Sequence, residues 1–379
     1  MTSPLELPFN TDEMINGLKP WIETESPTFN ASAVNRMMDI AQHDLAALGA
    51  RVERIPGRMG LGDSVRAFMP HPRMGEGGIL FLGHMDTVHA MGTLEKLPFK
   101  HEGSVCYGPG IQDMKGGNYV YLDALRKLLN AGIETPLPVT VLFTPDEEIG
   151  TPSTRELIEA EAKRHAFILV PEPARPDGGA VIGRYAIARF NLQTRGRASH
   201  AGWQLADGRS AIAKMAEHVA KIEAMTTDDC TFSIGVFHGG QWVNCVSSLC
   251  DAEVLTMAKT QELLDEAVEN MLELTDFDGD VVLEVKRGVT RPVWEPDQPG
   301  TMAMLALARE ISAEVGFEIS AASAGGGSDG NFTGALGLPT LDSIGVRGEG
   351  LHTLNEHIYV DSLIERAKLA AGLFCRLQA

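Results

Sequence analysis

Short apolar runs alternate with amphipathic segments over the first 170 residues. The runs are uniformly apolar, as expected for strands that are buried on both faces of a parallel sheet. These strands are predicted at 78–82, 139–143 and 166–170. In the intervening segments apolar residues recur every three or four positions, which is typical of helices packed on one face. These helices are predicted at 31–48, 117–129 and 153–162. The alternation predicts an α/β fold in which helices flank a mostly parallel sheet.

The pattern changes after Glu172, where strictly alternating stretches replace the apolar runs. Strands are predicted there at 188–194, 230–237 and 252–256, and helices at 210–225 and 261–272. Four helix breakers within 291–300 then mark a junction, and helices return at 301–315 and 361–377. We therefore expect a discontinuous domain formed by 1–183 and 293–379, with an inserted α+β domain at 184–292.

Composition and charge narrow the class of partner. Among 379 residues, 32 Lys and Arg stand against 51 Asp and Glu, and the resulting charge of −19 repels a nucleic-acid backbone. No apolar stretch approaches the roughly 20 residues of a membrane span. The first 13 residues lack the features of a secretion signal, and the five cysteines include no CxxC pair. We expect a soluble cytoplasmic protein that binds a small molecule and neither nucleic acid nor membranes.

At least one carboxylate follows each of the three predicted apolar strands, and a histidine accompanies it after the first. His84 and Asp86 follow the first strand, adjacent acids including Glu147 and Glu148 follow the second, and Glu172 follows the third. Open α/β sheets place their sites at the carboxyl ends of such strands. Each motif also has a structural interpretation, as a satisfied loop histidine or a solvated acidic turn. If the acids instead serve a metal, one carboxylate holds the ion and its neighbour reaches the ion's water.

Two further candidates lie on glycine-rich loops. Asp113 could cap the following helix, and His352 could serve a turn. Taken together, however, two imidazoles and three carboxylates suit a pair of zinc-like ions with one carboxylate bridging them. This set is His84, Asp113, Glu148, Glu172 and His352. Asp86, two residues from His84, can accept a hydrogen bond from one ring nitrogen while the other ligates a metal.

These motifs resemble the dizinc metallopeptidases that include glutamate carboxypeptidases, aminoacylases and succinyl-diaminopimelate desuccinylases. The matching stretches span most of the chain in the family's order. They are 83–88, 107–117, 146–150, Glu172, 183–184, 196–202, 325–329 and 352–353. The resemblance implies that His84 and Glu172 hold one metal and that Asp113 bridges it to a second. Glu148 and His352 would complete the second site.

The resemblance also implies roles in catalysis and assembly. Glu147 would be the general base, and Asp86 would orient His84. The inserted domain would be a lid or dimerisation domain, so that a homodimer is expected. In dimeric members the lid histidine, here His200, reaches the neighbouring subunit's site and stabilises the oxyanion; the alternative is a turn histidine. Asn244 falls where the family has a substrate-contacting lid residue.

One position departs from the family's pattern. Family peptidases usually carry an Arg on the strand after Asn244 to grip the substrate's α-carboxylate, but Met257 stands here. A thioether cannot form the bidentate pair of a guanidinium. Either another cation such as Arg291 or Lys259 replaces it, or the substrate is not an ordinary peptide C-terminus. Methionine instead suits an aromatic or aliphatic group. Glu172, where aminopeptidase members tend to have Asp, points away from an aminopeptidase.

We therefore expect a metal-dependent hydrolase that cleaves a C–N bond of a small molecule. It would use one or two divalent ions, zinc first, with manganese or cobalt also fitting such ligands. A carboxypeptidase or N-acyl-amino-acid amidohydrolase is favoured, because most family members are of that kind. The alternative favoured by Met257 is an aminohydrolase that removes an amine from a small aromatic substrate, as nitroanthranilate aminohydrolase does. A non-catalytic binding protein would have lost ligands or the base, and none of those positions is missing.

Overall fold

The computed structural model describes residues 3–378 and divides into two compact units. The main unit takes the described residues up to Gly183, together with Glu295–Ala324 and those from Ser328 onward. The inserted unit takes Arg184–Trp294 and Gly325–Gly327. No helix in the described part of the chain is long and apolar enough to cross a bilayer.

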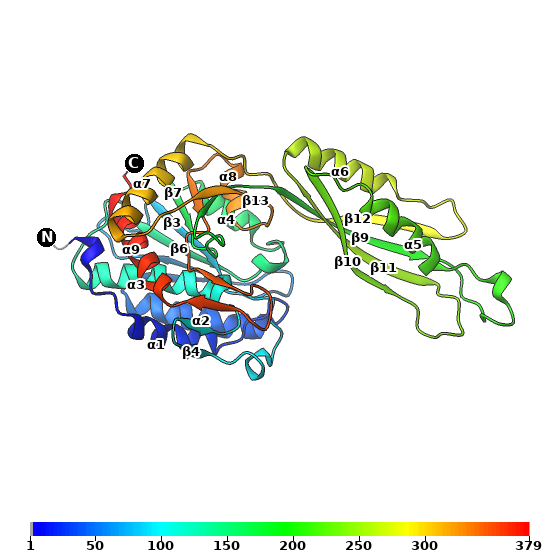
Figure 1. Ribbon diagram of the computed structural model, residues 1–379, viewed down its shortest axis with the longest axis horizontal. Coiled ribbons are helices and arrows are strands. Elements are labelled where there is room, and N and C mark those ends of the chain that lie inside the picture. Colours follow the sequence, from blue (N-terminus) through cyan, green and yellow to red (C-terminus); the bar gives the residue numbers. More distant parts are fainter. Residues whose placement is uncertain (1–2, 379) are drawn as a thin grey trace. The chain divides into compact units, whose positions relative to one another are not determined.

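An eight-stranded sheet forms the centre of the main unit, with strand order β1-β2-β6-β3-β7-β14-β8-β13 (Figure 1). Its four central strands run parallel. They are β6 (Val139–Thr144), β3 (Ile79–His84), β7 (Phe167–Val170) and β14 (Thr340–Asp342). The outer strands are β1 (Arg51–Ile55), β2 (Ser64–Phe68), β8 (Ala180–Arg184) and β13 (Ala321–Ala324). Every residue of β3 and β6 is buried, because helices cover both faces of the sheet.

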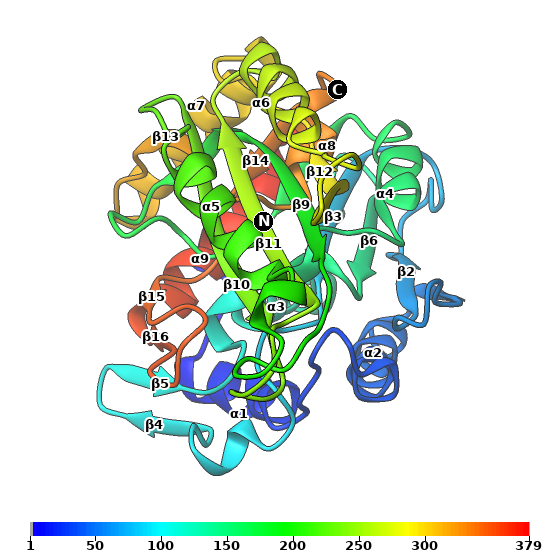
Figure 2. The ribbon, with the colours of Figure 1, turned by 90° about the vertical axis from the view of Figure 1, so that its right-hand side faces the viewer.

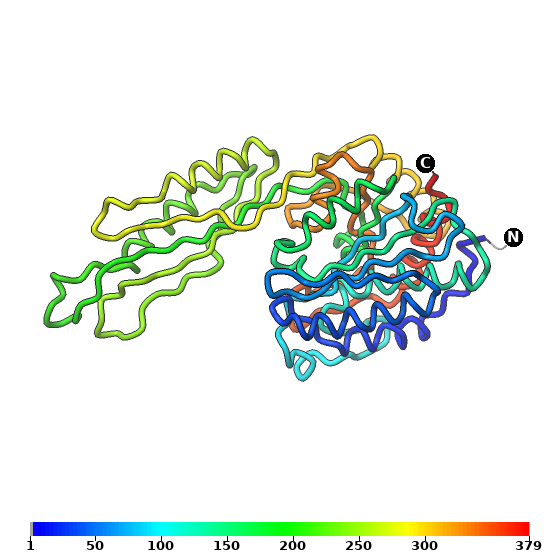
Figure 3. Tube along the Cα trace, turned by 180° about the vertical axis from the view of Figure 1, so that it is seen from behind, coloured from blue at the N-terminus to red at the C-terminus, as the bar shows by residue number. Residues whose placement is uncertain are grey.

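Alternate residues of the central strands pack against two layers of helices. Phe81 points into the larger layer and Leu80 into the smaller one. The larger layer contains α1 (Thr11–Ile22), α2 (Ala31–Ala47), α3 (Gly116–Asn130), α7 (Pro299–Val315) and α9 (Asp361–Arg376). The smaller layer contains α4 (Arg155–Ala162) and α8 (Gly330–Ala335). The predicted α/β fold with a mostly parallel sheet is confirmed, and α1 contacts α9 near the other end of the chain (Figure 3).

Smaller elements complete the main unit. A second sheet has the order β15-β16-β5-β4. Its strands are β15 (Gly348–Glu349), β16 (His357–Tyr359), β5 (Val105–Tyr107) and β4 (Lys100–Glu102). The short helical turns are η1 (Pro4–Glu6), η2 (Thr93–Glu95), η3 (Ile111–Lys115) and η4 (Glu147–Ile149), and η5 (Leu205–Asp207) lies in the inserted unit. The turns η3 and η4 carry candidate ligands, and both belong to the main unit.

The inserted unit is an antiparallel sheet with two helices on one face (Figure 2). Its strand order is β10-β11-β9-β12. The strands are β9 (Ala186–Arg195), β10 (Cys230–Gly239), β11 (Leu249–Ala258) and β12 (Val282–Arg291), and the helices are α5 (Ala211–Glu223) and α6 (Gln261–Glu273). Buried and exposed residues alternate along β9 and β11, because only one face of the sheet is covered by helices.

Candidate metal centre

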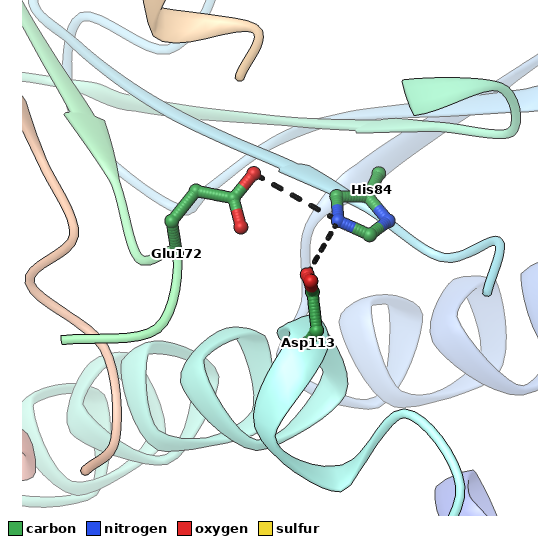
Figure 4. Close-up of side chains that lie close together, drawn as sticks. All are labelled: His84, Asp113 and Glu172. Carbon is green, nitrogen blue, oxygen red and sulfur yellow. Dashed lines mark hydrogen bonds and ion pairs between the residues drawn. The ribbon is translucent and has the colours of Figure 1, made fainter. Parts of the chain in front are cut away.

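His84 is the last residue of β3 and is completely buried. Its Nδ1 lies 3.0 Å from the backbone oxygen of Asp86 and 3.4 Å from the carboxylate Oδ1 of the same residue. Acceptors on this side place the ring proton on Nδ1. The opposite nitrogen, Nε2, lies 3.2 Å from Asp113 Oδ1 and 3.8 Å from Glu172 Oε1 (Figure 4). A nitrogen lone pair that faces two carboxylates has the arrangement of a ligating imidazole.

Asp113 faces a histidine with each of its two oxygens. Oδ1 faces His84, and Oδ2 lies 3.2 Å from His352 Nε2. Glu148 Oε2 lies 3.5 Å from the same His352 nitrogen. Two groups of three therefore share Asp113, and within each group the ligand atoms lie no more than 4.8 Å apart. They are His84, Asp113 and Glu172, and Asp113, Glu148 and His352.

The structure excludes the purely structural interpretations of Asp113 and His84 but agrees with a turn position for His352. Asp113 does not cap α3, because Lys115 occupies the cap position and Asp113 has non-helical backbone angles within η3. His84 is no ordinary loop histidine, since it ends a buried strand and faces two acids. His352 does occupy a turn, with a left-handed φ of 61°. That conformation is uncommon outside glycine, and here it accompanies an imidazole directed at Asp113.

Electrostatics in the cluster favour a bound cation. Burial and the nearby Asp113 carboxylate raise the pKa of Glu148 and of Glu172 well above the ordinary value. Burial opposes charge on His84, but hydrogen bonds with Asp113 and Asp86 outweigh it and raise the pKa of its ring. Divalent ions relieve such repulsion, and imidazole nitrogen with carboxylate oxygen is a donor set that zinc, manganese and cobalt all accept. The residues therefore fit a pair of divalent ions.

The turn after β6 is not a solvated acidic turn. Asp146 is fully buried and accepts hydrogen bonds from Ser153 N, Ser153 Oγ and Thr154 Oγ1. Its carboxylate therefore fixes the turn internally. Glu147 is only 8% exposed, and the Glu148 side chain is 5% exposed. Of the three neighbouring acids, one is structural and two line the site.

Asp86 joins His84 to this acidic turn. Its Oδ1 accepts the N–H of Glu147 at 3.2 Å, and its Oδ2 accepts the N–H of Glu148 at 3.3 Å. The hydroxyl of Thr28 donates to Oδ2 at 2.7 Å. One buried carboxylate thus fixes the backbone of both glutamates while it faces the His84 ring. Its contact with that ring is longer than the contact made by its own backbone oxygen.

Comparison with known proteins identifies the family to which this chain belongs. The profile of the family described as "Peptidase family M20/M25/M40" matches residues 80–376. The chain belongs to this family. Carboxypeptidase G2 of Pseudomonas sp. (strain RS-16) is 30% identical over 388 aligned residues, which cover 97% of this chain and 91% of the relative. Succinyl-diaminopimelate desuccinylase of Thioalkalivibrio sulfidiphilus is 26% identical and is covered to 85%, with 80% of this chain aligned.

A solved structure of a tripeptidase from Staphylococcus aureus has the same fold. It superimposes with a TM-score of 0.76 at 21% identity, covering 96% of this chain and 98% of that one. The predicted resemblance to dizinc metallopeptidases is confirmed. As a member of the M20/M25/M40 family, the chain is a hydrolase that acts on C–N bonds, and the family implies divalent metal ions.

Two further candidates lie on adjacent loops of the inserted unit. The backbone N–H of Ala201 donates to the backbone oxygen of Asn244 at 2.9 Å, so the loops of His200 and Asn244 are joined. His200 Nδ1 accepts N–H groups from Gly202 at 3.1 Å and Trp203 at 3.2 Å. In the neutral ring the proton is therefore on Nε2. Nδ1 of His200 thus stabilises the turn, while Nε2 carries a proton that it can donate. The side chains of His200 and Asn244 are both exposed.

An arginine lies in the same sheet as Met257. Met257 on β11 is in register with Ile187 on β9, which is in register with Arg291 on β12. Register partners project from the same face, so Met257 and Arg291 share one row with Ile187 between them. Arg291 is 4% exposed. Lys259, the other candidate cation, is engaged on the surface with Asp229 at 2.6 Å.

The sequence-based prediction missed several buried polar residues that hold the metal-site loops. The Lys115 ammonium donates to the backbone oxygens of Trp21 at 3.1 Å and Thr24 at 2.7 Å. Glu356 and His89 contact each other beneath the Asp113 loop. The only signal for Glu356 in the sequence was its place four residues after His352.

Proposed function

We propose that this protein hydrolyses the amide bond of a small peptide or N-acyl amino acid. The observation that carries the proposal is the pair of ligand groups that share Asp113, next to Glu147, a buried carboxylate outside both groups. Similarity to carboxypeptidase G2 over nearly the whole chain supports this substrate class. Zinc is the proposed ion, with manganese or cobalt as alternatives that the same ligands accept.

The proposed ligands divide around the shared carboxylate. His84 and Glu172 would hold one ion, Glu148 and His352 would hold the other, and Asp113 would serve both. When bound, two divalent ions polarise the scissile carbonyl and make an attacking water acidic at neutral pH. The ring of His84 is held for this role by Asp86, which faces Nδ1.

Proton transfer falls to Glu147. Its carboxylate accepts a proton from the attacking water and returns it to the departing nitrogen, so that the amine leaves without a negative charge. Its backbone is fixed by Asp86, which supports a constant position during both transfers. In a dimer, His200 would donate a hydrogen bond from Nε2 to the oxygen that becomes negative in the tetrahedral intermediate at the neighbouring subunit's site. We further propose that the inserted unit is a lid and mediates a cytoplasmic homodimer.

Arg291 is the proposed partner of the substrate's carboxylate, with Asn244 as a second substrate contact. Strands in a sheet are about 4.8 Å apart, so Arg291 stands roughly 10 Å along the row from Met257. A substrate carboxylate would be displaced by that distance relative to relatives with arginine in the methionine position. Met257 and Ile187 then form an apolar strip beside it.

The apolar strip formed by Met257 and Ile187 supports a second candidate function. An aminohydrolase that releases ammonia from a small aromatic amine needs an apolar contact and no grip on an α-carboxylate, which matches Met257. The same ions and the same base would serve that reaction, because a water also displaces nitrogen from carbon there.

Substrate profiling separates these candidates. The metal-loaded protein is assayed with dipeptides, N-acyl amino acids and anthranilate-like arylamines, with free amino acid and ammonia as readouts. Release of amino acid supports amide hydrolysis, whereas ammonia release from arylamines alone overturns it. Glu147→Gln is expected to abolish turnover while metal content is retained. Glu156→Gln on the exposed face of α4 is the matched control and should keep full activity.

A further inference from the structure

The carboxylate of Glu356 is the centre of a set of short contacts beneath η3. Glu356 is fully buried. Its Oε1 accepts the backbone N–H groups of Gln112 at 2.8 Å and Asp113 at 3.0 Å. Its Oε2 accepts the N–H of Gly110 at 2.9 Å and lies 2.5 Å from His89 Nε2. Both oxygens are therefore occupied by donors, three of which belong to the loop that carries the shared candidate ligand.

This loop depends on such an anchor because its backbone is not helical. Asp113 has φ −114° and ψ 98°, so the loop is not a regular helix, and the N–H groups at its start have no carbonyl partner within the turn. Successive N–H groups that converge on one point form a concave anion site, and an ionised carboxylate is its strongest natural occupant. Gly110 has φ 70°, and an added Cβ would lie 2.5 Å from Thr87 Cγ2, so the turn that aims these groups requires glycine.

Glu356 also connects the two segments that carry candidate ligands. It lies four residues after His352, and its backbone oxygen accepts the N–H of Gly108 at 3.3 Å. Strand β16, which begins at the next residue, pairs with β5, which leads into η3. The Asp113 loop and the His352 loop are thus tied together by one side chain and one pair of strands. At the other end of both loops, Asp113 Oδ2 and His352 Nε2 lie 3.2 Å apart.

We propose that Glu356 is a positioning residue for the metal pair, which acts with His89 through the η3 backbone. By holding the N–H groups of Gly110, Gln112 and Asp113, it keeps the carboxylate of Asp113 between His84 and His352, where both ions would require it. This role rests on the proposed metal-dependent function. Glu356 itself is in neither ligand group.

Glu356→Gln is the direct test. Glutamine has nearly the same volume but only one acceptor oxygen, so its amide NH₂ must face either the N–H groups on the Oε1 side or the donors on the Oε2 side. We expect the metal dissociation constant of the purified full-length protein to rise about 10–100-fold, as found when residues that support ligands are replaced. Chelator competition measures it, and the visible spectrum of the Co²⁺-substituted protein reports the changed ligand geometry independently of turnover.

Glu25→Gln is the matched control. Glu25 also accepts two backbone N–H groups, from Gly92 at 2.9 Å and Leu94 at 3.0 Å, but they belong to a loop without a candidate ligand. This variant loses the same charge and the same kind of hydrogen bond. Its metal dissociation constant should stay within about twofold of the wild-type value, which separates positioning of Asp113 from a general effect of one lost negative charge.

A second variant distinguishes the positioning role from misfolding. His89→Phe removes one of the two donors on the Oε2 side and leaves the Gly110 N–H in place, so it should weaken metal binding in the same direction and by less. If Glu356→Gln and His89→Phe lower the unfolding midpoint of the metal-free protein but leave the dissociation constant and Co²⁺ spectrum unchanged, the role is structural and the inference is wrong. Wild-type protein that binds no divalent ion would overturn the proposed function itself.

Discussion

Asp86→Asn is expected to reduce catalysis even when both metal sites are saturated. The Asp86 carboxylate is fully buried and accepts from Thr28 Oγ1, Glu147 N and Glu148 N. It also lies 3.4 Å from the Nδ1 of His84. Asparagine has the same shape, but one of its two terminal atoms donates instead of accepting. Whichever way the amide is turned, it sets a donor against the N–H of one glutamate.

The magnitude follows from the hydrogen bonds that are lost. A hydrogen bond to a charged group contributes about 1.5–3 kcal/mol. The amide orientation that keeps the Thr28 contact gives up the hydrogen bond from Glu147 N and the 3.4 Å contact with the His84 ring. A net loss of about 3 kcal/mol in the transition state corresponds to a roughly 100-fold lower kcat/KM, at 1.36 kcal/mol per factor of ten. The loss should appear mainly in kcat, because Glu147 moves relative to the reacting atoms.

The assay is steady-state hydrolysis of the best substrate at saturating metal, with metal content measured in the same samples. Asp63→Asn is the control: its carboxylate anchors a loop through Gly57 N at 2.8 Å and Arg54 Nε at 3.0 Å, apart from the candidate ligands. That variant should keep kcat within about twofold. Fully metal-loaded Asp86→Asn with a kcat/KM within threefold of wild type would refute the reasoning.

Three further outcomes are expected. Burial raises the pKa of Glu161, but contacts with His165 and Arg66 outweigh it and lower the pKa to about 2 from 4.5, so the stability that Glu161 contributes is present above pH 4.5 and is lost toward pH 2. Glu161→Gln should cost at most about 3 kcal/mol in urea unfolding at pH 7, and a pH-independent cost would contradict this. Met257→Arg should raise kcat/KM for N-acyl amino acids roughly tenfold relative to esters of the same compounds, and an equal change for both excludes carboxylate recognition. A divalent ion added to the metal-free protein at 100 times its dissociation constant should stabilise it by about 2.7 kcal/mol in thermal unfolding. An unchanged thermal midpoint would exclude tight binding.

Apolar runs predicted three of the four central strands within two residues, because a strand buried on both faces admits few polar side chains. The fourth, β14 (Thr340–Asp342), was not predicted. The run at 139–143, for example, appears as β6 (Val139–Thr144). Parallel pairing then brought the following histidine and acids to one edge, with His84 opposite Thr144 in register. The prediction that these groups converge required no side-chain detail.

Other features were not predictable because they depend on backbone groups, which every residue shares. Three adjacent acids follow β6, and only the turn geometry separates Asp146, which is bonded internally, from Glu147 and Glu148. The partners of Glu356 are three backbone N–H groups more than 240 positions earlier in the chain. No spacing rule connects such distant positions. The capping interpretation of Asp113 was wrong because the chain departs from helical angles there.

A single carboxylate that belongs to two ligand groups links their occupancies. The first ion to bind would fix the rotamer of Asp113 and neutralise part of the acidic cluster, which alters the free energy of loading the second site. Loading isotherms should therefore deviate from those of two independent sites. By the same linkage, stripping one ion changes the affinity of the other site, so inactivation by chelation should deviate from the dose response of two independent sites.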